Sequence, residues 1–126
     1  MTTFARALRR RVVRATSGEA LHEPDGRSAG DVQYRIDRVS EEGLIALAAR
    51  TLKPLGTFRL LSEGLSPEGV VVGRGAPTRR VVVDPIDGTR GLMYGKRSAY
   101  VLVGVAPESE RPRLRDLEVS IMVEIP

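Results

Sequence analysis

Two aspartates in the middle of the chain have the spacing of a ligand pair. Asp84 and Asp87 lie in the stretch VVVDPIDGT, separated only by a proline and an isoleucine. Two carboxylates held this close repel each other unless a cation lies between them. A hard divalent ion such as Mg²⁺ prefers oxygen ligands and commonly binds a few carboxylates together with a substrate phosphate. The spacing therefore makes this stretch a candidate metal and phosphate site.

The same stretch is also rich in turn-forming residues, each with a local reason to be there. Pro85 fixes its own φ and pushes Asp84 toward extended geometry, which suits the end of the preceding VVV strand. A turn after Pro85 would bring Asp87 back beside Asp84. Gly88 has no side chain to block the backbone amides, and Thr89 is a candidate cap for a short helix whose free N–H groups would face an anion. A plain surface turn and a ligand site both remain open on these residues alone.

Two amphipathic helices are expected ahead of this stretch. The first is predicted to end at Gly18 and carries apolar residues at helical spacing, namely Phe4, Leu8, Val12 and Ala15. The second has a similar apolar stripe and is closed by Pro54 and Gly56; its stripe consists of Leu44, Leu47, Ala48 and Leu52. Asp37 stands where a cap of this second helix would stand.

Short apolar segments bounded by Gly, Pro and Ser follow, and we expect them to form buried strands. They cover residues 58–64, 69–73, 79–84, 99–106 and 117–125. Helices followed by a strand-rich half indicate an α/β chain of the layered α+β type, with a mixed sheet covered by helices. The last strand is so hydrophobic that we expect it to be paired on both edges, with more chain following it. Residues 1–126 are expected to form one domain.

Composition excludes several classes of site. The chain has no cysteine, so it has no disulfide, thiolate zinc site or cysteine nucleophile. No apolar run approaches the roughly 18 residues of a membrane span, and we expect a cytoplasmic protein with no membrane partner. The only histidine, His22, lies in a polar loop without a visible partner.

The excess positive charge is almost entirely arginine, because Lys53 and Lys96 are the only lysines and the formal net charge is +4. Arginine forks suit phosphates and carboxylates, but a solvated arginine-rich surface is the favoured explanation of the composition. Few and scattered aromatic residues argue against single-strand binding by stacking, so a nucleic-acid partner is disfavoured. The arginine-rich start also resembles a transit peptide, but such peptides are usually richer in serine.

The stretch VVVDPIDGT resembles the Asp-Pro-(Ile/Leu)-Asp-Gly-(Thr/Ser) signature of the inositol monophosphatase and fructose-1,6-bisphosphatase superfamily. GDVQYRID upstream is similar to the family's Asp-x-x-Thr-x-x-Asp segment, with Tyr34 in place of the usual threonine. LLSEG is similar to its Gly-Glu-Glu strand end, with Glu63 kept and Gly64 replacing the second glutamate. The strands after the signature also match, so the resemblance covers about residues 30–125. It implies the N-terminal half of a fructose-1,6-bisphosphatase-like fold, with the C-terminal half absent.

The resemblance also implies roles for individual residues. Glu63 would ligate a first metal and orient the attacking water, and Asp84 would bridge metals. Ile86 would offer its main-chain carbonyl, and Asp87 would bind a second metal. The substrate phosphate would contact Asp87 and the amides of Gly88 and Thr89, with the Thr89 hydroxyl also positioning the water. Arg90 would either reach this phosphate or be a solvated residue of the first helical turn. Asp37 would lie near a weaker, peripheral metal position.

The function that the resemblance implies is a Mg²⁺-dependent, lithium-sensitive phosphomonoesterase. It would act on a small sugar or inositol phosphate or on a nucleotide 3′-phosphate. The nucleotide alternative comes from GTRGLMYG, which is similar to the Gly-Thr-Lys-Gly-Phe form of nucleotide 3′-phosphatases. The family's Trp-Asp motif has no counterpart in a chain without tryptophan. A non-catalytic metal- and phosphate-binding remnant or interaction module, and less favourably a basic nucleic-acid binder, are the alternatives. Association of two copies of the chain into a homodimer stays open.

Overall fold

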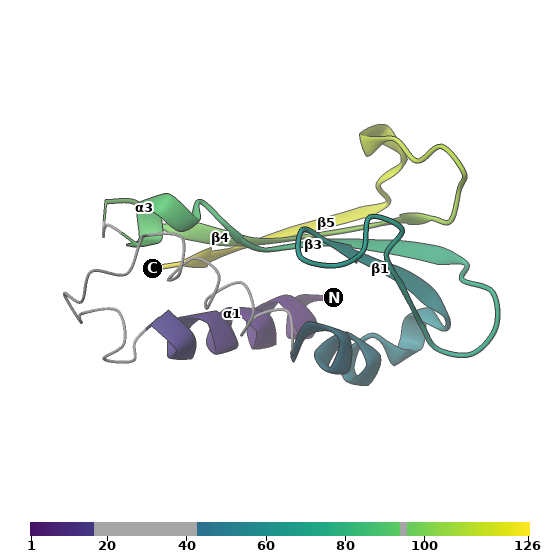
Figure 1. The fold of residues 1–126 in the computed structure, drawn as a ribbon, viewed down its shortest axis with the longest axis horizontal. Coiled ribbons are helices and arrows are strands. Elements are labelled where there is room, and N and C mark those ends of the chain that lie inside the picture. Colours follow the sequence, from purple (N-terminus) through teal and green to yellow (C-terminus); the bar gives the residue numbers. More distant parts are fainter. Residues whose placement is uncertain (17–42, 94–95) are drawn as a thin grey trace.

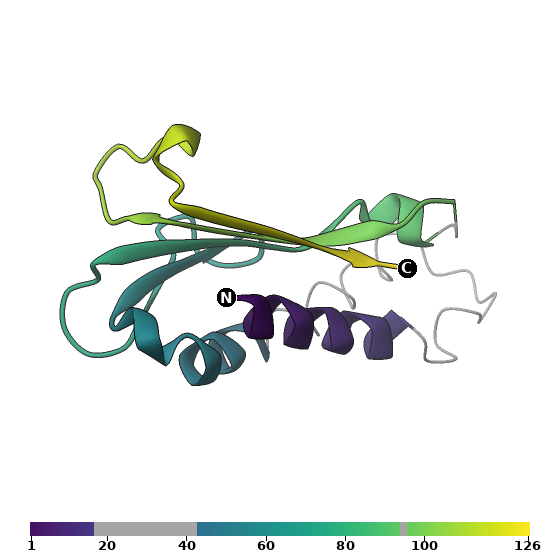
Figure 2. The same cartoon turned by 180° about the vertical axis from the view of Figure 1, so that it is seen from behind.

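Two helices cover one face of a twisted sheet in the computed structural model, which describes residues 1–16, 43–93 and 96–126 (Figures 1 and 2). The first helix is α1 (Thr2–Thr16), and a second helix is described over residues 43–51 and is followed by the 3₁₀ turn η2 (Lys53–Leu55). The remaining elements are β1 (Phe58–Ser62), β2 (Val70–Val72), β3 (Arg79–Asp87), α3 (Thr89–Met93), β4 (Ala99–Pro107), the 3₁₀ turn η3 (Leu114–Asp116) and β5 (Val119–Ile125). No helix within these ranges is long and apolar enough to cross a membrane.

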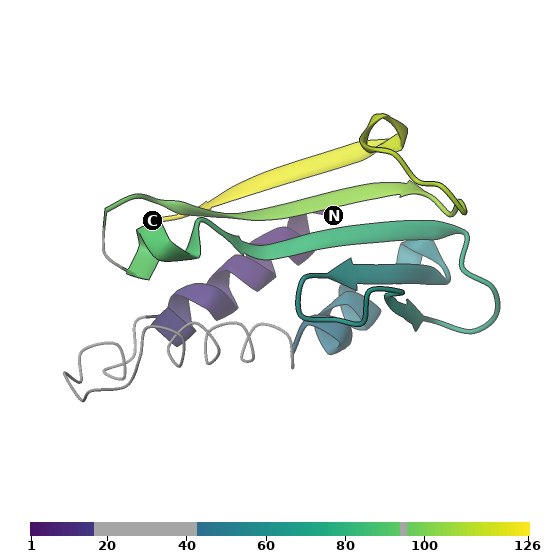
Figure 3. The same ribbon diagram turned by 45° about the horizontal axis from the view of Figure 1, so that its top comes forward.

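The strand order in the sheet is β2-β1-β3-β4-β5 (Figure 3). β1 and β3 run parallel, and every other neighbouring pair is antiparallel. The expected mixed sheet is therefore confirmed. β5 was predicted to be paired on both edges, but it is an edge strand whose only partner among the described residues is β4. Its burial alternates over its second half, with Ile125 buried and Met122 exposed.

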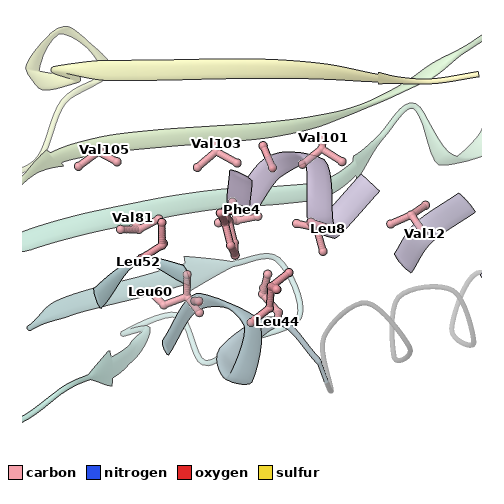
Figure 4. Close-up of a cluster of buried hydrophobic side chains, with 14 of the residues drawn as sticks. Phe4, Leu8, Val12, Leu44, Leu52, Leu60, Val81, Val101, Val103 and Val105 are labelled. Atoms are coloured by element: carbon pink, nitrogen blue, oxygen red, sulfur yellow. The ribbon is translucent and has the colours of Figure 1, made fainter. Parts of the chain in front are cut away.

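The core lies between the helices and the sheet (Figure 4). Phe4, Leu8 and Val12 point from α1 into this core and are at most 2% exposed. The second helix contributes Leu44, Leu47 and Ala48 to the core, and Leu52 follows directly after the helix. All four residues of this predicted stripe are buried. The sheet contributes alternate residues of its three inner strands, β1, β3 and β4, to the core. They are Phe58, Leu60, Val81, Val83, Val101, Val103 and Val105. The predicted face of the second helix is confirmed, and that of the first is confirmed for Phe4, Leu8 and Val12. Gly18, His22 and Asp37 and the side chain of Ala15 lie outside the described parts of the chain.

A half-buried ion-pair cluster joins β1, β3 and the residue after β4. Arg59 and Arg80 are partners in the parallel register, and both donate to one carboxylate oxygen of Glu108, at 3.0 and 2.9 Å. Burial raises the pKa of Glu108, but the hydrogen bonds and positive charges of Arg80 and Arg59 outweigh it and hold that pKa below its usual 4.5. The cluster therefore needs an ionised glutamate to neutralise two adjacent guanidinium groups.

Candidate phosphate and metal site

The candidate site forms where two parallel strands end at the same edge of the sheet. β1 and β3 pair from Phe58 opposite Arg79 to Ser62 opposite Val83. One residue further along each strand stand Glu63 and Asp84. Ligand sites in sheets with parallel strands favour the carboxyl ends of those strands. The topology thus brings together two acids that are 21 positions apart in the sequence.

Asp87 is placed by a bulge in β3, not by a turn. Asp84 pairs with Leu102 and Asp87 with Tyr100, so three steps along β3 match two steps along β4. The predicted strand end at Asp84 and the turn after Pro85 are therefore wrong, because β3 continues through Asp87 before the chain turns. A proline has no N–H to donate to a ladder, and a bulge leaves one residue unpaired, so the two features suit each other. Bulges occur next to active sites, where they redirect a side chain.

Asp84 is anchored by the bulged backbone. Its Oδ1 accepts a hydrogen bond from the Ile86 N–H at 3.0 Å, and its side chain is half-buried. Pro85 and Ile86 are both buried, which breaks the alternation seen earlier in β3. The bulge therefore holds the Asp84 carboxylate in place.

The chain leaves β3 through Gly88 and enters α3. Gly88 has a φ of +90°, a conformation that favours glycine, and its carbonyl accepts the Leu92 N–H that closes the first helical turn. Thr89 was predicted to cap this helix with its side chain, but its hydroxyl donates to the Ile86 carbonyl at 2.9 Å. This hydrogen bond links the Thr89 hydroxyl to the bulge. The first backbone N–H groups of α3 have no acceptor within the helix.

Glu63 and Asp87 present exposed carboxylates, and neither side chain has a hydrogen bond or ion pair with the described residues. Arg90 is exposed in the same way at the start of α3. Within residues 1–16, 43–93 and 96–126, no three acidic or histidine side chains gather closely enough to hold a metal ion. The carboxylates of Asp84 and Asp87 and the Ile86 carbonyl remain the candidate donors at the bulge. The peripheral candidate, Asp37, is among the residues that the structure leaves undescribed.

Ser62 is a polar residue at this edge that the sequence analysis did not single out. It is the last residue of β1 and precedes Glu63. Its Oγ is buried and has no hydrogen-bond partner in the described structure. A buried hydroxyl of this kind is normally satisfied by water or a ligand atom, which fits a polar site at the strand ends. The strand alternation could have indicated it, because Phe58, Leu60 and Ser62 share one face.

Comparison with known proteins identifies the fold. No protein-family model and no curated protein sequence matches the chain. Two solved structures of the extragenic suppressor protein SuhB from Bartonella henselae are similar, with TM-scores of 0.57 and 0.55 and identities of 21% and 22%. Each similarity covers 83% of this chain, and 36% and 38% of the respective SuhB chains. CysQ from Bacteroides thetaiotaomicron, a bacterial member of the inositol monophosphatase family, has a TM-score of 0.51 at 18% identity, covering 82% of this chain and 36% of CysQ.

These similarities confirm the fold that the motifs led us to expect. The described architecture is that of part of an inositol monophosphatase-type structure, built on a mixed sheet with helices on one face. The chain spans little more than a third of the length of the solved proteins it matches.

Proposed function

We propose that this chain provides the metal- and phosphate-binding site of a Mg²⁺-dependent phosphomonoesterase. The observation that supports the proposal is the end of the β1–β3 pairing, where Glu63 and Asp84 follow the last paired residues and a bulge in β3 presents Asp87. A surface turn needs neither a buried proline inside a strand nor acids delivered from two separate strands. The arrangement is easier to understand as a set of oxygen ligands on a rigid support.

The donors at this edge suit Mg²⁺. They are carboxylate and carbonyl oxygens, and Mg²⁺ is usually bound by one or two carboxylates plus substrate phosphates, keeping several waters. Asp84, Ile86 and Asp87 would hold the ion nearest the bulge, with Glu63 contributing from the end of β1. Bound Mg²⁺ would neutralise charge on the phosphoryl oxygens and acidify the attacking water.

The chain's own residues would position the reacting groups. Glu63 is exposed and has no partner among the described side chains, so it would accept a hydrogen bond from the attacking water and orient it. The Thr89 hydroxyl, already held by the Ile86 carbonyl, would contact the water or the phosphate from the other side. The Gly88 and Thr89 amides would donate to the phosphate oxygens. Phosphoryl transfer depends mainly on such positioning and charge stabilisation.

The proposed substrate class is a small phosphorylated metabolite, either a sugar or inositol phosphate or a nucleotide 3′-phosphate. Arg90 supports an anionic substrate because its exposed guanidinium follows Thr89 directly. Guanidinium forks bind phosphate oxygens bidentately. We therefore assign Arg90 to substrate binding.

The test is Mg²⁺-dependent phosphate release from a panel containing inositol phosphate, fructose bisphosphate and 3′-phosphoadenosine phosphate. We expect release with at least one compound, loss of release on chelation, and inhibition by lithium. Asp87→Asn should abolish release, whereas Glu110→Gln, which removes an exposed acid in the loop before η3, should not. Metal binding without release from any compound would overturn the enzymatic proposal and favour a non-catalytic binding module.

A further inference from the structure

Three arginines form a stripe along the solvent side of α1. Arg6, Arg10 and Arg14 are exposed and spaced four residues apart. At about 1.5 Å rise per residue, the stripe is roughly 12 Å long. None of the three has a hydrogen bond or ion pair with the described part of the chain. We call these three residues the arginine stripe.

The arginines beside the stripe are used differently. Arg9 donates to the Glu124 main-chain carbonyl at 2.6 Å, and Arg11 donates to the Gly43 carbonyl at 2.7 Å. These two bonds tie α1 to β5 and to the second helix. These bonds hold α1 against its neighbours, and the side chains of the stripe stay exposed.

The helix contains no acidic residue that could neutralise the stripe. Surface helices often pair charges of opposite sign at this spacing, and like charges four residues apart destabilise a helix. The repulsion within the stripe would be relieved by an anion that spans all three side chains. A single small anion cannot do this over such a length, whereas a chain of phosphates can.

A membrane surface fits this helix poorly. Peripheral helices bind by burying an apolar face at the lipid boundary, but the apolar face of α1 is already buried in the core, with Phe4 and Leu8 at 0% exposure. The stripe offers charge alone, delivered by side chains that match phosphate geometry. Backbone binding of this kind needs no aromatic stacking, so the scarcity of aromatic residues does not oppose it.

We propose that the arginine stripe binds the phosphodiester backbone of a nucleic acid, without sequence preference and independently of the phosphatase site. One phosphate contact for each stripe arginine sets the expected affinity and its salt dependence. Binding should be weak, with a Kd on the order of 10⁻⁴–10⁻⁶ M at physiological salt. It should depend on salt with a slope of log K against log[salt] that includes about one unit for each stripe arginine.

The test is fluorescence anisotropy with labelled duplex DNA and duplex RNA, each in two unrelated sequences, across about 50 to 200 mM salt. The stripe variant is Arg6→Gln/Arg10→Gln/Arg14→Gln. Its matched control is Arg74→Gln/Arg111→Gln/Arg115→Gln, which removes the same charge from exposed arginines outside α1. We expect the stripe variant to lose affinity and to show a slope shallower by about 2–3 units, while the control keeps the wild-type slope. The DNA and RNA arms show which backbone is preferred.

Circular dichroism melting of both variants separates binding from folding, since all six arginines are exposed. Absence of binding by the wild-type chain would overturn the proposal. An equal loss in the two variants would also overturn it, because net charge alone would then explain the binding. Vesicles of phosphatidylserine and phosphatidylcholine serve as a further arm, and stripe-dependent binding to vesicles without binding to nucleic acid would contradict the assignment.

Discussion

Glu63 and Asp84 each directly follow a member of the last pair in the parallel register of β1 and β3, Ser62 opposite Val83. This relationship cannot exist between antiparallel neighbours, whose carboxyl ends lie at opposite edges. β1 and β3 are the only parallel pair among the described strands. The acids that the motifs singled out thus belong to the one pair of strands that can bring them to the same edge.

Gly88 should be intolerant of a side chain for conformational reasons. An added Cβ would be 3.6 Å from the Ala99 Cα, which is ordinary contact, so Gly88→Ala should cost on the order of 1–2 kcal/mol through its φ of +90° alone. Gly75→Ala is the matched control, because Gly75 has a φ of +92° with nothing near its added Cβ. Urea unfolding should show similar losses in both, and only Gly88→Ala should weaken phosphate release. Equal activity of the two variants would argue against a phosphate contact at Gly88.

The Thr89 hydroxyl should stabilise the bulge as well as the proposed site. Thr89→Val removes its bond to the Ile86 carbonyl while keeping the shape, and we expect a loss of about 1 kcal/mol in the free energy of unfolding. Thr89→Ser should retain most of the stability and of the phosphate release. If Val and Ser variants unfold at the same urea concentration, the hydroxyl does not brace the bulge.

Glu108 should make stability depend on pH in the acidic range. Its pKa is lowered in the folded state, so its contribution is complete above the unfolded value of 4.5 and is lost as pH falls through the folded pKa. Glu108→Gln should therefore unfold more easily than wild type at pH 7, and the difference should shrink toward about pH 3. Thermal melts of both proteins over this range measure it; a constant difference would contradict the assigned ionisation.

Arg90 should affect substrate binding without affecting folding. It is exposed and makes no bond with the described residues, so Arg90→Gln should leave the melting temperature unchanged. Its loss should raise KM for the active phosphomonoester by roughly tenfold, the effect of one charge-assisted contact. Arg115→Gln is the surface control. An unchanged KM in Arg90→Gln would assign this arginine to the solvated surface.

Much of the fold could be predicted because burial leaves a periodic record in the sequence. The helical stripes through Phe4 and Leu44 are buried as expected. The strands were predicted to be buried, but they bury one face only, and Val71, Val82 and Val119 are exposed. The bulge at Pro85 could not be predicted, because proline and glycine near acids are equally typical of a turn. Only the register with β4 separates the two. The edge position of β5 likewise depends on its partners, which its own residues do not encode.

The most direct test of the account is calorimetric titration of Mg²⁺, with Mn²⁺ as a second ion, into wild type, Asp84→Asn and Asp87→Asn. Asp84→Asn keeps an acceptor for the Ile86 N–H, so the bulge should persist while the charge is lost. Glu110→Gln controls for the removal of one exposed acid elsewhere. The account predicts saturable binding in wild type and in Glu110→Gln, and no saturable binding in either asparagine variant. Unchanged titrations in both asparagine variants would contradict a metal site at the bulge.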